Sequence, residues 1–136
     1  MNKRFLVILG ASLILFSSCR ESLDHRILRE TSSFNQRNCP KRIDDYVVLD
    51  SISYIVNENT PNEYKYCHSV NCDSTDFALL IEHEENMRNE ILKRIRNAQD
   101  LRLIKDAGIT ISYLFYTQDS KDSIFYFRYP LESYQN

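Results

Sequence analysis

This sequence has very little glycine and no tryptophan. Its 136 residues include two glycines and no tryptophan. Loops that cradle phosphate through backbone N–H groups need several closely spaced glycines, and a nucleophile elbow needs two glycines around its serine. The sequence therefore has no P-loop, no Rossmann fingerprint and no G-x-S-x-G motif, and we expect no cofactor.

Complete catalytic and metal-binding motifs are also lacking. The segment from His83 to Met87 begins like the zinc motif H-E-x-x-H, but Met87 stands where the second histidine must lie. His68 falls on an apolar strand face, where a hydrogen-bonded packing role is expected. Asp44-Asp45 and Asp50 lie near one another in the sequence, but acid–base catalysis requires carboxylates that meet inside a cleft. We therefore predict no catalytic residue and no metal site.

A short apolar segment begins the chain. Lys3 and Arg4 precede an apolar run from Phe5 to Phe16. A helix of this length spans roughly 18 Å, whereas the hydrocarbon core of a membrane is ~30 Å thick. A basic start, a short apolar segment and the small pair Ser17-Ser18 are typical of a secretory signal rather than of a transmembrane helix.

The residue that follows this segment is Cys19. Two small residues and a cysteine after an apolar run resemble the lipobox of bacterial lipoproteins. The resemblance implies that diacylglycerol alkylates the Cys19 thiol and that cleavage makes Cys19 the new N-terminus. Two or three acyl chains then anchor the protein stably, and Arg20, where aspartate often signals inner-membrane retention, favours the outer membrane. The alternative is an ordinary secretory signal with an incidental cysteine.

Removal of residues 1–18 would leave 118 residues, enough for one domain with one hydrophobic core. Loss of Lys3 and Arg4 lowers the number of basic residues from 17 to 15, against 19 acidic residues, which gives a net charge of −4. Because there is no basic excess, we expect no nucleic-acid partner. We predict that residues 19–24 form a lipidated tether and that residues 25–136 form a single α+β domain.

Three further cysteines are Cys39, Cys67 and Cys72. Export takes a chain into an oxidising compartment, where thiols pair, and an odd number leaves one thiol unpaired. We expect one disulfide, with Cys67 and Cys72 as the possible pair and Cys39 as an alternative partner. A zinc site is not expected, because a structural site needs a second pair of ligands.

Four segments have the alternation of apolar and polar residues that is typical of strands: residues 45–57, 63–70, 109–116 and 123–129. The last two are expected to pair as a hairpin with Phe115 opposite Phe125. The first two are expected to pair with Val56 opposite Tyr64. One-residue shifts would exchange the faces of a strand, so the alternation constrains the register.

Helical periodicity is found between Ser22 and Pro40, over residues 77–98 and over residues 100–107. The resulting order α-ββ-α-ββ predicts an α+β fold, with a four-stranded antiparallel sheet made of two hairpins and helices packed on one face. The other face is expected to be in contact with water. On it, Tyr116, Tyr126 and Arg128 form a possible contact face, because tyrosine and arginine are enriched in protein interfaces.

The segments Asn35–Asp44, Leu49–Tyr54, Tyr64–Tyr66 and Gly108–Tyr116 occur in the same order as similar segments in a group of small exported bacterial proteins of unassigned function. The chain resembles that group over most of residues 23–130, although Cys39 stands where the group usually has an apolar residue. The resemblance implies a shared fold. It implies no catalytic residues.

These observations lead to a functional expectation. We expect a binding or accessory protein that the acyl chains on Cys19 hold in the bacterial cell envelope, with an unknown envelope protein as its partner. One alternative is an immunity protein against a secreted toxin. Another is an envelope hydrolase, which would have to unite His68, Asp50 or His83 with a thiol or hydroxyl group. A structural lipoprotein without a specific ligand is a further alternative.

Overall fold

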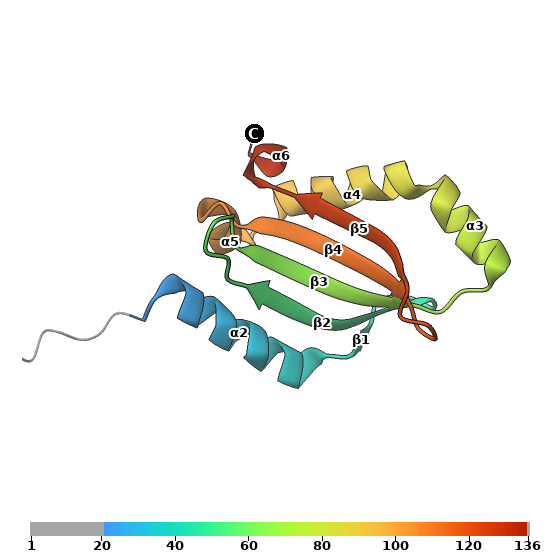
Figure 1. The fold of residues 1–136 in the computed structure, drawn as a ribbon, viewed down its shortest axis with the longest axis horizontal. Helices are drawn as coiled ribbons and strands as arrows, with labels where there is room; N and C mark the ends of the chain where they lie inside the picture. The colour runs from blue at the N-terminus through green and yellow to red at the C-terminus, as the bar shows by residue number, and fades with distance from the viewer. Residues whose placement is uncertain (1–20, 136) are drawn as a thin grey trace, which may run out of the picture.

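The computed structural model of the protein describes residues 21–135 (Figure 1). The expected signal segment and the expected lipidation residue, Cys19, lie outside the described residues. Within them the helices are α2 (Leu23–Asn38), α3 (Ser74–Glu82), α4 (Glu84–Asn97), α5 (Arg102–Asp106) and α6 (Leu131–Tyr134). The strands are β1 (Lys41–Arg42), β2 (Val47–Ile55), β3 (Glu63–Val70), β4 (Thr110–Thr117) and β5 (Ser123–Tyr129).

The strands form one sheet in the order β1-β2-β3-β4-β5. The α+β class is confirmed, but the predicted four-stranded antiparallel sheet is wrong in two respects. The two-residue strand β1 pairs with β2 and adds a fifth strand, and β3 and β4 run parallel. The two predicted hairpins are antiparallel, as expected. The connection from β3 to β4, however, contains α3, α4 and α5. This crossover returns the chain to the end of the sheet where β3 begins, so β4 runs parallel to β3.

The predicted register is correct in the second hairpin and wrong in the first. Phe115 lies opposite Phe125, as expected, whereas Tyr64 lies opposite Tyr54 rather than Val56. The error of two residues preserves the faces of the strands. A bulge between Leu49 and Ser51 adds one residue to β2, so Leu49 joins the buried face. The bulge thus resets the alternation of β2 at Asp50.

Helix α2 begins and ends as the sequence predicts. The side chain of Ser22 caps it by accepting a hydrogen bond from the backbone N–H of His25. The side chain of Asn35 bonds both to the N–H of Ile52, at 2.9 Å, and to its C=O, at 2.8 Å. Asn35 thus satisfies backbone groups of β2 as a neighbouring strand would. Because α2 includes Leu23 and Asp24, helical structure extends into the expected tether.

The helix expected over residues 77–98 is two helices that meet at His83. The backbone of His83 has φ −99° and ψ 12°, outside the helical range, and it ends α3 and precedes α4. Ile91 and Ile95 on α4 are buried, whereas no residue of α3 is buried. Leu80 is the α3 residue that packs against the core cluster, and it is only partly buried. The break at His83 therefore separates α4, which packs on the sheet, from α3, which lies largely at the surface.

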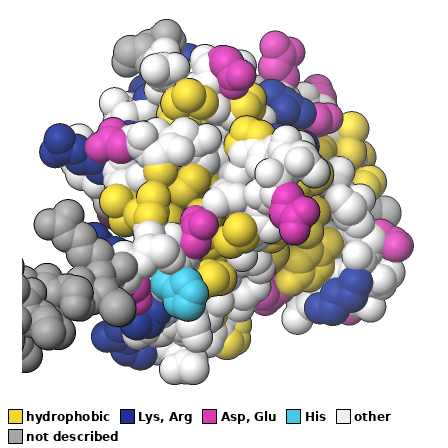
Figure 2. All heavy atoms as spheres, turned by 60° about the vertical axis from the view of Figure 1, so that its left-hand side comes forward, with side chains coloured by type: hydrophobic (Ala, Val, Ile, Leu, Met, Phe, Trp, Pro, Cys, Tyr) yellow, Lys and Arg dark blue, Asp and Glu magenta, His cyan; other side chains and the backbone are white. Residues whose placement is uncertain are grey.

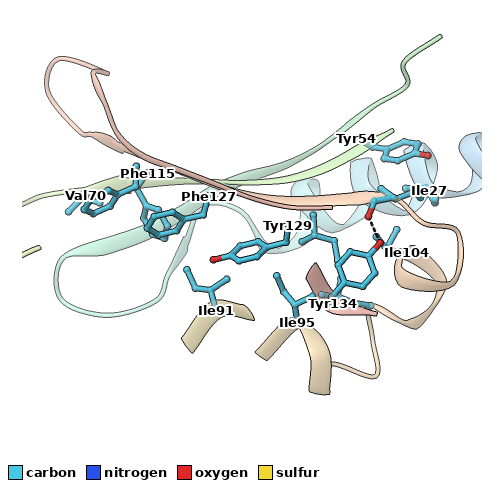
Figure 3. Close-up of a cluster of buried hydrophobic side chains, with 14 residues drawn as sticks. Ile27, Tyr54, Val70, Ile91, Ile95, Ile104, Phe115, Phe127, Tyr129 and Tyr134 are labelled. Atoms are coloured by element: carbon cyan, nitrogen blue, oxygen red, sulfur yellow. Dashed lines mark hydrogen bonds between the residues drawn. The ribbon is translucent and has the colours of Figure 1, made fainter. Parts of the chain in front are cut away.

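The hydrophobic core lies between the sheet and α4. Figure 3 shows Phe115, Phe127 and Tyr129 on the side of the sheet toward Ile91 and Ile95. At one end of the core, the hydroxyl of Tyr134 donates to the carbonyl of Ile109 at 2.7 Å. Gly108 ends the segment after α5 with φ 68°, a left-handed geometry that glycine adopts without strain.

Truncation of Ile95 should test this arrangement, because its side chain is 0% exposed at the centre of the core. We expect Ile95→Ala to lower the free energy of unfolding by about 2–5 kcal/mol, since it removes apolar contacts and leaves a cavity. The control is Lys93→Ala, which changes an exposed residue of the same helix and should have an effect within about 0.5 kcal/mol. Urea denaturation of both variants measures the free energy of unfolding. Equal losses in Ile95→Ala and Lys93→Ala would contradict a core centred on Ile95.

Candidate functional site

The face of the sheet opposite α4 carries a group of polar side chains. Residues that alternate with the buried ones on each strand point to this side. We call it the open face and define it as Asp50, Ser51, Ser53, Glu63, Lys65, Cys67, Ser69, Ser112, Leu114, Tyr116, Tyr126 and Arg128. Helix α4 does not cover this face, but Glu63, Ser69 and Ser112 are buried beneath the other side chains of the face.

One carboxylate on the open face is that of Asp50. The bulge in β2 directs Asp50 to the same side as Ser51. One carboxylate oxygen, Oδ1, accepts a hydrogen bond from the hydroxyl of Ser69 at 3.1 Å, and the other, Oδ2, accepts one from the hydroxyl of Tyr116. Asp50 therefore connects β2 with β3 and β4 and fixes the ring of Tyr116 over the sheet.

The second carboxylate is that of Glu63, at the start of β3. Its side chain lies over fully buried Ser112, and the residue is 6% exposed. Oε1 accepts hydrogen bonds from the hydroxyl of Ser112 at 2.5 Å and from the hydroxyl of Tyr126. The guanidinium of Arg128 is 4.0 Å from the same oxygen. Glu63 thus joins β3, β4 and β5.

The electrostatics of the open face favour a charged Glu63 and neutral tyrosines. Burial by itself raises the pKa of Glu63, but hydrogen bonds from Ser112 and Tyr126 and the charges of Lys65 and Arg128 outweigh it, so the pKa is lowered. Burial raises the pKa of Tyr126, and its hydrogen bond to Glu63 raises it further. Burial and the bond to Asp50 likewise raise the pKa of Tyr116.

Cations lie over both tyrosine rings. The ammonium of Lys65 is 5.3 Å from the ring centre of Tyr126, and the guanidinium of Arg128 is 5.8 Å from it. The ammonium of Lys121 is 5.2 Å from the ring centre of Tyr116. Each tyrosine is therefore held by a carboxylate at its hydroxyl and by a cation at its ring face.

The structure brings Tyr116, Tyr126 and Arg128 to one face, but the two carboxylates that organise them were missed in the sequence. The sequence predicts no catalytic role for Asp50 and no role for Glu63 at the start of its strand. The sequence holds no signal for them, because a charged residue on the polar face of a strand requires a partner only when it is buried. The partners come from strands that are distant in the sequence, so they could not be named.

Cys39, Cys67 and Cys72 are free thiols in the structure. Cys67 is a member of the open face, whereas Cys72 packs against the hydrophobic core. Burial raises the pKa of the Cys39 and Cys72 thiols, and nearby aspartates raise it further. The pairing of Cys67 with Cys72, or of either with Cys39, stays a prediction.

The residues considered for a hydrolase do not meet at one place. His68 lies on the buried face of β3, whereas Asp50 lies on the open face. His83 is at the junction of α3 and α4. Among residues 21–135, no group of three or more His, Cys, Asp or Glu side chains has the arrangement of a metal site.

The outer surface has charges of mixed sign. On the side shown in Figure 2, Lys and Arg side chains lie among Asp and Glu side chains. On α2, Arg26 pairs with Glu30 at 2.8 Å, and Arg29 pairs at 2.5 Å with Glu21, which precedes the helix. No helix within the described part of the chain has the length and apolar character needed to cross a membrane.

The fold and the open face define a small α+β protein with a mixed five-stranded sheet, helices against one face and a polar network on the other. A family model, "Domain of unknown function (DUF8479)", matches residues 22–126, and the chain belongs to this family. The chain is similar in fold to a crystal structure from Pseudomonas aeruginosa described as "a putative secreted protein". The TM-score is 0.63 at 14% identity, over 85% of this chain and 100% of the other. A comparison with curated proteins gave no match.

The charge of Glu63 can be tested by its effect on stability against pH. Because the folded protein lowers the pKa of Glu63, this carboxylate stabilises the fold above its ordinary pKa, near 4.5, and the stabilisation is lost as the pH falls through the lower folded value. We expect Glu63→Gln to lower the free energy of unfolding by about 1–3 kcal/mol at pH 7, since hydrogen bonds to a charged acceptor are lost. The difference from wild type should shrink toward pH 3.

Denaturant unfolding at a series of pH values measures this difference. The matched control is Glu58→Gln, which replaces an exposed carboxylate in the turn between β2 and β3. Its effect should stay within about 0.5 kcal/mol. A pH-independent loss of stability in Glu63→Gln would contradict the role of the charge.

Proposed function

We propose that this protein is a lipid-anchored binding or accessory protein of the bacterial cell envelope, and that it binds an envelope protein through its open face. Export is supported by the N-terminal sequence and by the description of the similar Pseudomonas structure as a secreted protein. Anchoring is supported by the small-small-cysteine sequence that ends at Cys19. Arg20 supports placement in the outer membrane.

The observation that carries the binding role is the organisation of the two tyrosines. Asp50 and Glu63 fix the hydroxyls of Tyr116 and Tyr126, so these rings lose little freedom when a partner covers them. Preorganised aromatic side chains lower the entropic cost of association. A face that only met water would not need the buried carboxylate of Glu63 and the half-buried carboxylate of Asp50 beneath its tyrosines.

The charges on this face favour a partner with carboxylates. Glu63 is buried and its charge is already paired, whereas Arg128 is exposed beside Tyr126. Lys121, over the ring of Tyr116, is exposed as well. The groups that a partner can reach are therefore cations and aromatic rings, which suit an acidic protein surface.

Site-specific photocrosslinking in intact cells tests the open face. A benzoylphenylalanine at Ser53, on the open face of β2, should give one discrete adduct that mass spectrometry identifies as an envelope protein. The adduct should decrease at least tenfold when Arg128→Glu is added, because charge reversal repels an acidic partner. The control probe is placed at Leu28, which is exposed on α2.

Adducts of equal yield from Ser53 and Leu28 would contradict the proposal. So would an adduct at Ser53 that Arg128→Glu leaves unchanged. Circular dichroism of the Arg128→Glu variant verifies that the exposed substitution leaves the fold intact.

The anchor is tested separately with Cys19→Ala in the full chain. We expect wild type to sediment with membranes and to carry diacylglycerol-derived mass on its mature N-terminus. The variant should lack that mass and should leave the outer-membrane fraction. Membrane fractionation with mass spectrometry of the N-terminus measures both, and an unmodified N-terminus in wild type would contradict lipid anchoring.

A further inference from the structure

Two adjoining cavities lie on the helical side of the sheet, away from the open face. One, of about 220 Å³, lies between α4 and the sheet and has apolar walls that include Met87, Ile91 and Phe115. The other, of about 230 Å³, lies beside α3 and has walls that include Val70 and Leu80. Asp44 and Val47 line both cavities. Together the volumes fall within the range of about 300–1,000 Å³ that is typical of small-molecule sites.

A buried imidazole lies in the wall of the first cavity. His68 is 7% exposed, and its Nδ1 atom has no hydrogen-bond partner among the described residues. Its ring is stacked on Phe115, with ring centres 4.7 Å apart, and on Tyr113, with ring centres 5.8 Å apart. Stacking on both neighbours fixes the ring. A buried polar atom without a partner is unfavourable, so this atom requires a group that the described chain does not supply.

The chemistry of that group follows from the state of the imidazole. Burial lowers the pKa of His68. A hydrogen bond with the backbone of Leu114 and the charge of Asp50 raise it in part, but the net shift is downward, so the ring is neutral at pH 7. A neutral imidazole has one nitrogen that donates and one that accepts. A hydroxyl group can donate and accept, and it therefore suits Nδ1 in either tautomer. Water has the same capacity, but a buried water needs two to four polar partners, and these walls are mostly apolar.

The charged side chains in the cavity wall favour a neutral ligand. Glu90 and Arg94, both exposed on α4, contribute one charge of each sign. The carboxylate of Asp44 is already engaged, because its Oδ1 accepts from the backbone N–H groups of Tyr46 and Val47, each at 2.8 Å. An anionic headgroup would be repelled by Glu90, and a cationic headgroup would be repelled by Arg94. A neutral headgroup avoids this.

We propose that the two cavities bind a neutral single-chain aliphatic molecule that carries a hydroxyl group, with its chain along the apolar walls and its hydroxyl on Nδ1 of His68. This site is independent of the open face, because it lies on the opposite side of the sheet. Loss of either site would leave the other unaffected.

The test compares 1-octanol with octane, which share the same chain and differ in the hydroxyl. Residues 21–135 are used, because they contain all five strands and the whole core cluster and lack the expected acyl anchor, which would itself compete for apolar ligands. We expect 1-octanol to bind about tenfold more tightly than octane, as for one hydrogen bond to a buried polar atom. In ¹⁵N-histidine spectra the Nδ1 resonance of His68 should shift with 1-octanol and not with octane.

Two variants and one control complete the design. His68→Phe keeps an aromatic ring in the stack and should bind both compounds equally. Ile43→Trp enlarges a residue that is 51% exposed and lines the first cavity, so it should weaken the binding of both compounds at least tenfold. Leu28→Trp changes an exposed leucine on α2 that lines neither cavity and should leave binding unchanged.

The proposal is overturned by any of three results. The first is that neither compound binds wild type up to its aqueous solubility. The second is that 1-octanol and octane bind wild type equally, or that His68→Phe retains the preference for 1-octanol. The third is that Ile43→Trp binds both compounds as wild type does, which would place the binding outside these cavities.

Discussion

The parallel pairing of β3 with β4 is the constraint on which the rest of the structure depends. Glu63 lies beside Thr110 at one end of this pair and Val70 lies beside Thr117 at the other, so the two central strands are in register over their full length. A parallel pair requires the chain to return along the sheet, and α3, α4 and α5 make this return. The return path places α4 against one face. The opposite face keeps its polar residues.

The two faces of the sheet solve different physical problems. On the helical face, aromatic and β-branched residues exclude water, and one imidazole is left without a hydrogen-bond partner. On the open face, the buried carboxylate of Glu63 and the half-buried carboxylate of Asp50 lie beneath tyrosines, and each is stabilised by hydroxyl donors from other strands. A buried charge without such donors would be strongly destabilising. The network is therefore possible only because three or more strands supply groups to it, and the same groups hold Tyr116 and Tyr126 in place.

Local patterns predicted much of the fold. The start of α2 near Ser22, its end before Pro40 and the pairing of Phe115 with Phe125 depend on residues that are close in the sequence, where periodicity and turn chemistry decide the conformation. The predictions failed where a distant contact decided. The direction of β4 relative to β3 depends on a crossover of helices, and the bulge at Asp50 depends on hydrogen bonds to Ser69 and Tyr116. The division at His83 separates α4, which packs on the sheet, from α3, which has no buried residue.

By itself, the sequence determined which residues alternate, where most elements begin and end, and that Tyr116, Tyr126 and Arg128 share a polar face. These properties follow from the two-residue period of strands and from the conformational preferences of single residues. Only the tertiary structure decided that Glu63 and Asp50 lie beneath those tyrosines and that His68 lines a cavity. The reason is that hydrogen bonds and cavities join residues about 20 to 70 positions apart, whose proximity no local pattern encodes.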